Sequence, residues 1–392
     1  MVAILDAVVI GAGAAGLTAS YELARNGLNI KLLEASGRIG GRVRKTDTFT
    51  DFPLDLGGAW IHVDPSFLDD IVNDANVPVD KSKIVDYKPD YRYYWGPDKS
   101  WNPEVFSEKQ DHSFINSTWF DFFQHYIAPA SAASLELNCV VNQIDSTSNS
   151  FIKVTCKDGR AFQAKNVVVT TSIAVLKRAD ITFLPDLPSD KKRAIQNVKF
   201  DDGLKVFFKF SKRFYDQAFD SYYSVAEDTA DGDRYFFDAT YGQSTYENIL
   251  GVFIRGVQAG SYVNLGDDAI KSKLLSEIDL MYAGQASRFY LSHNIANWNK
   301  EPYIGGLYSN HAASNSYGAI KTISSPISMG RIYFAGEALE PNGEYGYVHG
   351  AALTGQSVAQ QIVEGRQNQH EWCKQSMCSR RPLDCFCFHC LC

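Results

Sequence analysis

The chain has 392 residues, of which 45% are hydrophobic, 13% aromatic and 21% charged. This length predicts two domains, and the composition is that of a globular protein rather than a disordered or fibrous one. The net charge of −7 argues against nucleic acid as a partner. No apolar stretch is long enough to cross a bilayer, and the N-terminus lacks the pattern of a secretion signal, so a cytoplasmic location is expected.

The first 44 residues carry the strongest motif. An apolar run at residues 8–10 leads into the glycine turn at residues 11–16, a helical pattern and a second apolar run that ends at Glu34. In such a unit the glycines permit a tight turn, the approach of a pyrophosphate and close helix packing. The helix N-terminus attracts phosphate, and the acid is placed to bind an adenosine ribose. The unit therefore predicts a dinucleotide site. The alternative, glycines that serve packing alone, explains neither Glu34 nor the arginine-glycine loop at 38–42.

The middle of the chain shows helical patterns followed by strand patterns. The predicted helices cover residues 66–76, 117–127 and 267–282, and the predicted strands cover residues 140–144, 151–156, 161–164, 167–169, 204–210 and 249–255. A hairpin turn is expected at 157–159. The acidic residues between 216 and 233 are interpreted as a solvated loop.

The end of the chain repeats the pattern of its beginning. A strand at 331–335 ends in Gly336-Glu337, and a helix rich in small residues begins near Val348. The two ends are therefore predicted to build one domain, with the middle forming another.

The cysteines fall into two groups. Cys139 and Cys156 lie in the body of the chain, and two scattered cysteines fit a reducing compartment. The others crowd the C-terminus: Cys373, Cys378, Cys385, Cys387, Cys390 and Cys392. That tail could bind metal or carry a lipid, but its spacing suits one tetrahedral ion poorly, so a tail without a role is favoured. No metal site is expected in the body.

Several segments, in this order, resemble the flavin-containing amine oxidases, the family of monoamine and polyamine oxidases. The matching segments are residues 11–16, Glu34-Ala35, 38–42, 57–62, 167–170, 175–177, 205–207, Trp298 with Tyr303, Gly306 and Tyr308, 334–337 and 346–351. The resemblance implies an α/β fold in which a Rossmann-like FAD-binding domain (GR2-type), split across the chain, adjoins an α+β substrate domain with a mixed sheet. Residues 1–80, 135–200 and 320–366 would form the first domain, residues 81–134 and 201–319 the second, and residues 367–392 a disordered tail.

The same resemblance implies FAD as cofactor and a small-molecule amine, with a polyamine favoured, as substrate. Hydride would pass from the carbon next to nitrogen to flavin N5, and O2 would reoxidise the flavin to give H2O2, an aldehyde and a smaller amine. Two alternatives stay open. One is oxidation of a non-amine substrate on the same cofactor, and the other is a truncated flavin-binding member without turnover.

The family pattern also assigns roles to residues. Lys205 would hold a water against flavin N5, Tyr303 and Tyr347 would enclose the amine, and His62 would face its nitrogen. The alternatives are an exposed strand face for Lys205, a surface loop for His62 and core packing for the tyrosines. The predicted cofactor-binding residues are Gly11, Gly13, Ala14, Ala15, Gly16, Glu34, Ala35, Arg38, Gly41, Arg42, Gly57, Gly58, Ala59, Trp60, Val141, Thr170, Trp298, Gly336, Glu337, Gly346, Tyr347 and Val348.

Three departures from the family pattern stand out. Only about 75 residues separate Trp60 from Leu137, so the helical part of the substrate domain is expected to be shortened. Ser172 and Ala174 stand where the family usually has proline and glycine. The shortening bears on substrate binding more than on cofactor binding.

Overall fold

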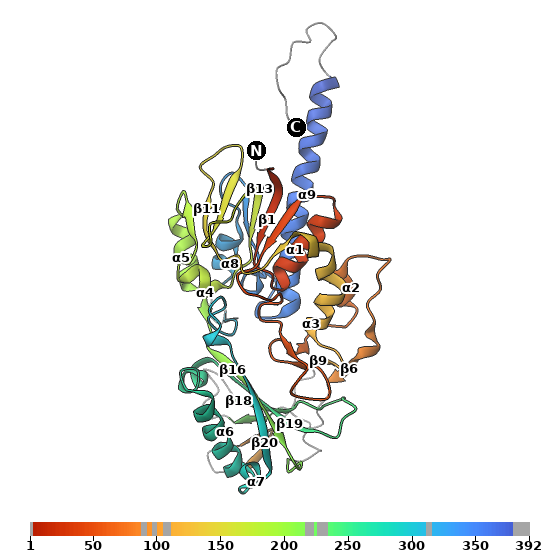
Figure 1. Ribbon diagram of the computed structural model, residues 1–392, viewed down its shortest axis with the longest axis vertical. Helices are drawn as coiled ribbons and strands as arrows, with labels where there is room; N and C mark the ends of the chain where they lie inside the picture. The colour runs from red at the N-terminus through yellow and green to blue at the C-terminus, as the bar shows by residue number, and fades with distance from the viewer. Residues whose placement is uncertain are drawn as a thin grey trace.

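Two large sheets organise the chain, and Figure 1 shows them in the upper and lower halves of the molecule. The computed structural model describes residues 3–87, 92–95, 100–104, 111–215, 223–225, 234–310 and 316–378. Within this part of the chain, no helix is both long and apolar enough to span a membrane.

The first sheet has eight strands in the order β10-β2-β1-β13-β12-β11-β14, with β22 paired to β13. Strand β1 lies parallel to both β2 and β13, and β22 is parallel to β13, so segments from both ends of the chain share this sheet. Its strands are β1 (Leu5–Ile10), β2 (Ile30–Leu33), β10 (Leu135–Glu136), β11 (Val141–Asp145), β12 (Ile152–Cys156), β13 (Ala161–Val169), β14 (Thr182–Leu184) and β22 (Ile332–Phe334).

Alternating side chains of β1 serve two cores, because successive residues of a strand point to opposite faces. Ala7 and Val9 pack with helices α1 (Ala14–Arg25) and α9 (Val348–Cys378). Val8 and Ile10 belong to the core on the other face, which is covered by α4 (Ile173–Lys177), α5 (Ser189–Asn197) and α8 (Ser316–Ser324). Burial on both faces explains why residues 7–10 of this strand form a continuous apolar run.

The second sheet has seven strands in the order β20-β16-β19-β18-β17-β7-β8. They are β7 (Arg92–Trp95), β8 (Trp101–Glu104), β16 (Gly203–Phe210), β17 (Tyr223–Val225), β18 (Arg234–Asp238), β19 (Asn248–Arg255) and β20 (Tyr290–Asn297). Leu204, Val206 and Phe208 on one face pack against α6 (Asp267–Met281), with α7 (Gln285–Phe289) beside it. The opposite face, with Lys205 and Phe207, turns toward the first sheet and its loops.

Smaller elements connect the two sheets. Strands β5, β9 and β6 form a three-stranded sheet, while β3 pairs with β4 and β15 pairs with β21. Their bounds are β3 (Lys45–Thr46), β4 (Leu54–Asp55), β5 (Trp60–Ile61), β6 (Ile84–Tyr87), β9 (Asp111–Phe114), β15 (Lys199–Phe200) and β21 (Ser309–Asn310). The short helices are α2 (Phe67–Val72), α3 (Trp119–Phe122), and the turns Lys81–Lys83, Phe123–Ile127, Ala128–Ser134, Gly256–Ser261, Trp298–Lys300 and Glu337–Leu339.

Three predicted elements differ from the observed ones. The helix predicted at 66–76 ends at Val72, because Asn73 adopts a left-handed conformation (φ 50°) that terminates a helix. The strands predicted at 161–164 and 167–169 are one strand, β13. Lys165 and Asn166 continue it, and both side chains bond to Asp6 on β1.

The C-terminal segment also differs from its prediction. The tail predicted to be disordered from residue 367 begins as helix, since α9 continues through Cys378. Figure 1 shows this helix running past the first sheet. The cysteines from 385 onward and the acidic residues between 216 and 233 lie outside the described residues, so their predicted roles stay predictions. Strand β17 (Tyr223–Val225), between those acids, is described.

The domain boundaries also stay predictions. Residues 119–127, assigned to the substrate part, lie in the same core as α1: Trp119, Phe122, Phe123 and Ile127 all pack there.

Candidate functional site

A cavity of about 830 Å³ lies between the first sheet and the second. It is lined by the glycine turn, the arginine-glycine loop, residues 57–62, strands β16, β18 and β19, and the start of α9. Of all the residues predicted to bind cofactor or substrate, only Gly16 is not on its wall. The fold therefore brings residues from both ends of the chain, from Gly11 to Val348, to the wall of one cavity.

The glycine turn joins β1 to α1 as its spacing predicts. Gly11 has a φ of 103°, which a residue with a side chain rarely adopts. A Cβ on Gly16 would lie 1.8 Å from the carbonyl oxygen of Gly11, so this position must be glycine for α1 to start here. Helix α1 begins at Ala14, and its first backbone N–H groups and the positive end of its dipole lie at the cavity.

Glu34 is held rigidly at the end of β2. One carboxylate oxygen accepts from the Ala12 backbone N–H at 2.8 Å, and the other accepts from the backbone N–H and hydroxyl of Ser36 at 2.8 and 2.7 Å. The side chain is buried yet lines the cavity. This geometry fixes an acceptor where an adenosine ribose would lie in a βαβ dinucleotide site.

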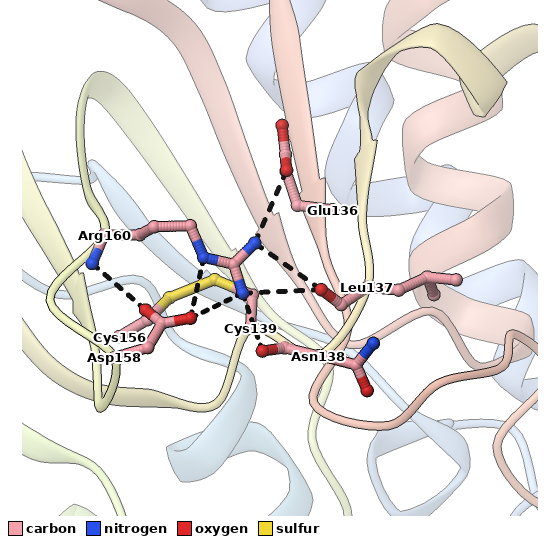
Figure 2. The surroundings of a disulfide bond; sticks show 7 residues. All are labelled: Glu136, Leu137, Asn138, Cys139, Cys156, Asp158 and Arg160. Atoms are coloured by element: carbon pink, nitrogen blue, oxygen red, sulfur yellow. Dashed lines mark hydrogen bonds and ion pairs between the residues drawn. A yellow bond between two sulfur atoms is a disulfide. The ribbon is translucent and has the colours of Figure 1, made fainter.

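A disulfide bond lies beside the cavity, and Figure 2 shows its surroundings. Cys139, on the cavity wall just before Val141, is bonded to Cys156 at the end of β12. Arg160 connects the two strands' ends near this disulfide. It donates a hydrogen bond to the carbonyl of Asn138 at 2.6 Å and forms an ion pair with Asp158 at 2.7 Å. The prediction of a reducing compartment assumed that Cys139 and Cys156 are scattered. That premise is wrong, because β11 and β12 are neighbours and bring the two residues together. Sequence separation alone could not reveal that pairing.

The arginine-glycine loop connects to the C-terminal part of the chain. Arg42 donates to Glu337 at 2.8 Å and to the carbonyl of Leu307 at 3.0 Å. Glu337 is buried and also accepts from the hydroxyl of Ser309 at 2.5 Å and from the backbone N–H of Gly346 at 3.1 Å. One carboxylate thus ties together four segments of the cavity wall.

Arg38, at the other end of the loop, folds back on its own backbone. It donates to the carbonyl of Gly41 at 2.8 Å and to that of Ile39 at 3.3 Å. Burial and the nearby charge of Arg44 lower the pKa of its guanidinium.

Lys205 is buried beneath the cavity, which contradicts the alternative of an exposed strand face. Strand β16 lies between β19 and β20, and the lysine is only 3% exposed. Its Nζ donates to the carbonyl of Gly57 at 2.6 Å and lies 4.8 Å from the ring centroid of Trp60. Burial lowers the pKa of Lys205 to about 8, while the neighbouring charge of Asp55 opposes that shift. Burial in turn raises the pKa of the Asp55 carboxyl, although Lys205 opposes it.

His62 also faces the cavity rather than open solvent. Its ring lies 4.5 Å from the ring of Tyr347, and its Nδ1 is 2.9 Å from a carboxylate oxygen of Asp111. The ring of Tyr347 stacks in turn on His349 at 5.3 Å. Asp111 was not predicted, since it reaches His62 only through the pairing of β5 with β9.

The two tyrosines near residue 305 lie in different environments. Tyr303 lines the cavity, but its side chain is 41% exposed. Tyr308 is partly buried, and a Cβ on Gly346, the residue before Tyr347, would lie 3.5 Å from its ring. Burial raises the pKa of the Tyr308 hydroxyl, which accepts from Arg255 at 3.2 Å. Tyr308 therefore lies beside Gly346 and is more buried than the predicted Tyr303, and both tyrosines line the cavity. Tyr308 belongs to a segment that resembles the family, but the sequence alone does not indicate its burial.

The two tryptophans pack against the wall, as expected. Trp298 is buried beneath the guanidinium of Arg44, whose Cζ is 5.1 Å from the indole centroid. Trp60 meets Phe237 edge to face at 5.1 Å. In the described part of the chain, no three histidine, cysteine or acidic residues are grouped to hold a metal ion.

Comparison with known proteins identifies the family. The family model described as flavin containing amine oxidoreductase matches residues 14–123 and 104–363. The chain belongs to this family. FAD is its cofactor, and the fold is the expected Rossmann-like FAD domain combined with a substrate domain.

Individual members of the amine oxidoreductase family are similar to the chain at low identity. Polyamine oxidase 6 of Oryza sativa subsp. japonica is 27% identical over 62% of this chain and 48% of that protein. Histone demethylase-like protein A of Aspergillus fumigatus is 30% identical over 58% of this chain and 22% of that protein. The chain thus spans half or less of the length of these two relatives. Probable polyamine oxidase 4 of Arabidopsis thaliana is 22% identical over 90% of this chain and 86% of that protein.

Solved structures show the same fold. Wild-type putrescine oxidase bound to putrescine superposes with a TM-score of 0.77 at 15% identity, covering 93% of this chain and 100% of that one. Cyclohexylamine oxidase from Brevibacterium oxydans IH-35A gives a TM-score of 0.74 at 15% identity, again over 93% and 100%.

The lengths of two alignments indicate that this chain is shorter than its relatives. They extend over 436 and 444 positions with two relatives, more than the 392 residues of this chain. The relatives therefore carry residues that this chain lacks. The helical turn Ala128–Ser134 leads here directly into β10, which is where the sequence pattern predicts the shortening.

The residues of the cavity wall fit FAD, because two of its glycines leave their backbone open to a ligand. A Cβ on Gly13 would have its nearest neighbour at 4.0 Å, and one on Gly336 would meet nothing within 4 Å. Both positions line the cavity, so open space lies over backbone that can approach a ligand closely. The acceptor at Glu34, the first residues of α1 and the cation Arg42 all line that space, and an adenosine ribose, a pyrophosphate and a ribityl chain are groups that such residues bind.

Proposed function

We propose that this chain is an FAD-dependent amine oxidase whose substrate binds at the end of the cavity lined by Lys205, His62, Tyr308 and Tyr347. Membership in the amine oxidoreductase family supports the reaction class. The observation that carries the proposal is the placement of a buried lysine and an aromatic wall from four separate segments at one end of a cavity whose other end has the dinucleotide motif.

Bound FAD would supply the two-electron acceptor for oxidation of the carbon next to the amine nitrogen, with dioxygen as the final acceptor. We assign cofactor binding to Glu34 and Val141 at the adenosine, to the α1 N-terminus at the pyrophosphate, and to Glu337 and Val348 nearer the ring. The N-terminus of the long helix α9 lies on the cavity wall at Val348. Its dipole would favour negative charge arriving there.

The residues of the substrate end have distinct tasks in this proposal. Tyr308 and Tyr347 form the aromatic walls that hold an amine and exclude water. His62, oriented by Asp111, accepts a hydrogen bond or proton from the amine, which must be neutral to be oxidised. Lys205 holds a water molecule near the redox centre, and its pKa of about 8 allows it to exchange a proton near neutral pH.

The names of several relatives agree with the sequence-based preference for a polyamine, and that preference stays a prediction. Oxidation of a non-amine substrate and flavin binding without turnover are the alternatives that the experiment must separate.

The test is reduction of the purified protein under anaerobic conditions. We expect a yellow protein whose flavin absorbance is bleached by an amine from a panel of polyamines, monoamines and amino acids, with stoichiometric H2O2 on admission of air. Lys205→Met should slow reoxidation of the flavin by about 100-fold, while Lys209→Met, on the same strand near its solvent end, should not. A flavoprotein that no amine reduces would refute the proposal.

A further inference from the structure

The disulfide between Cys139 and Cys156 adjoins the residues assigned to the adenosine of FAD (Figure 2). Cys139, Glu34 and Val141 all line the cavity. The backbone N–H of Cys139 donates to the carbonyl of Glu34 at 2.8 Å. In the register of β11 with β12, Val141 lies directly opposite Cys156. The disulfide therefore ties β12 to the short segment that contacts Glu34 and leads into Val141.

Hydrogen bonds close to solvent make other connections between these two segments. Arg160 donates to the carbonyl of Asn138 at 2.6 Å, and its side chain is 36% exposed. The backbone N–H of Lys157, in the exposed hairpin turn, donates to the carbonyl of Val140 at 2.8 Å. The ladder between β11 and β12 is irregular just after Val141. Because water can replace the partners of exposed hydrogen bonds, the disulfide is the more durable link at this point.

The two cysteines lie in a packed apolar core. Cys139 is 1% exposed and Cys156 is 2% exposed, and both belong to the core that contains Leu33 and Val141. Two unbonded sulfur atoms need more room than a bonded pair, and a close-packed interior has little room to give. Reduction to two thiols should therefore shift the start of β11 relative to β12. That shift reaches Glu34 through its backbone bond with Cys139.

The disulfide meets the cavity through one of its two residues. Cys139 is on the cavity wall, whereas Cys156 is not among the lining residues. A thiolate that approaches through the cavity would therefore attack the sulfur of Cys139, with Cys156 as the departing thiolate. FAD bound against Glu34 and Val141 would cover the same part of the wall. The cofactor should therefore protect the disulfide from a reductant.

We propose that Cys139 and Cys156 form a redox modification site that controls FAD binding: a dithiol opens the disulfide, and the reduced protein binds FAD more weakly. The attacking thiolate breaks the bond between the two sulfurs and forms a mixed disulfide with Cys139. The second thiol of the reductant then displaces Cys139. The protein gains two electrons and two protons as two thiols, and the dithiol is oxidised to a cyclic disulfide.

This inference rests on one part of the proposed function, the placement of the adenosine at Glu34 and Val141. It does not depend on which substrate is oxidised. Its tests measure cofactor binding and thiol content, so they need no turnover.

The first test compares FAD binding in the two redox states of the full chain. The protein without FAD, treated anaerobically with or without excess dithiothreitol, is titrated with FAD by fluorescence. Alkylation followed by mass spectrometry shows whether Cys139 and Cys156 are reduced. We expect the reduced protein to bind FAD about 10-fold more weakly, within the usual range for two coupled sites. Removal of dithiothreitol and addition of oxidised glutathione should restore the affinity.

The second test uses thermodynamic linkage. If reduction weakens FAD binding by some factor, saturating FAD must make the disulfide harder to reduce by the same factor. That factor is obtained by counting thiols at graded ratios of reduced to oxidised dithiothreitol, with and without FAD. Two unequal factors would assign the change in FAD binding to other thiols and overturn the inference.

Two variants assign the effect to this pair of cysteines. Cys139→Ser combined with Cys156→Ser keeps the six cysteines of the C-terminal segment. It should bind FAD as weakly as the reduced wild type and should not respond to dithiothreitol. The complementary variant, with those six cysteines replaced by serine, should respond as the wild type does. It decides the question if the first variant does not fold.

The outcomes separate this inference from the proposed function. An FAD dissociation constant that is unchanged on reduction, or a disulfide that resists dithiothreitol in the absence of FAD, would overturn this inference alone and leave a purely structural cross-link. A protein that binds no FAD in either redox state would overturn both proposals.

Discussion

At the scale of single residues, Lys205 and Asp55 form the most consequential pair. The lysine lies 4.8 Å from the Trp60 ring and is bonded to the carbonyl of Gly57, so it has lost most of its contact with water. Burial disfavours its charged form, and the carboxylate of Asp55 favours it. The pKa of about 8 is the balance of these two opposing effects.

Asp55→Asn should therefore lower the pKa of Lys205 further, by about one unit or more. A lysine with a lowered pKa loses its proton as the pH rises through the new value, so any rate that needs the ammonium should fall at lower pH than in the wild type. The measurement is the pH dependence of flavin reoxidation by air after reduction with dithionite, which requires no amine. Asp47→Asn, in the same hairpin but exposed, is the control. Superimposable profiles for wild type and Asp55→Asn would show that the pair is not coupled.

The sequence predicts the site residues that belong to local motifs and misses those that depend on strand register. Gly11, Glu34 and Glu337 are recognisable because the chemistry of each is contained in a few consecutive residues. Arg255 and Tyr235 have no such signal. They reach the cavity only because β18, β19 and β16 are adjacent, a pairing that sets Tyr235 opposite Phe253 and Arg255 opposite Gly203. The difference in burial between Tyr303 and Tyr308 also leaves no signal in the sequence, because it depends on how distant segments pack around them.

At the scale of elements, the packing of α1 on α9 holds the FAD part together. A Cβ on Gly355 of α9 would lie 2.1 Å from the carbonyl oxygen of Ala15 in α1, so the two backbones approach too closely for a side chain. Gly365, ten residues further along the same helix, is exposed and would meet nothing within 4 Å. The two glycines thus differ in packing and share the same secondary structure.

Gly355→Ala should destabilise the protein by about 2–3 kcal/mol, because the helices must separate and the N-terminus of α1 moves with them. Gly365→Ala should instead stabilise it by about 0.5–1 kcal/mol through helix propensity alone. Urea unfolding monitored by circular dichroism measures both changes. Equal effects of the two substitutions would mean that the close approach of α1 and α9 is not rigid.

Elements at both ends of the chain were predictable because their patterns are strong, whereas the connections in the middle were not. The strands β1 and β2 and the start of α9 follow from apolar runs and small residues. The strands β18 and β20 carry mixed polar and aromatic residues without clear alternation, and their partners fix them in the sheet. The left-handed Asn73 that ends α2 likewise leaves no trace in the spacing of apolar residues.

At the scale of the whole molecule, Glu337 is the point where the first and last parts of the chain meet. Its carboxylate binds Arg42 from the N-terminal loop, Ser309 from β21 and the backbone of Gly346 before α9. The first and last of these segments, at Arg42 and Gly346, are more than 300 residues apart in the sequence. The carboxylate is buried, so loss of its charge would leave donors in the cavity wall without a matching acceptor.

Glu337→Gln should lower the free energy of unfolding by about 2–3 kcal/mol, because an amide cannot compensate Arg42 and turns a donor toward Ser309 or Gly346. FAD affinity should fall as well, since the cavity wall at residues 42, 309 and 346 is no longer held in one arrangement. Glu364→Gln, an exposed change on α9, should alter neither quantity. Thermal unfolding with and without added FAD, together with fluorescence titration of FAD, separates the two effects. A variant with normal unfolding but weak FAD binding would limit the role of Glu337 to the cofactor.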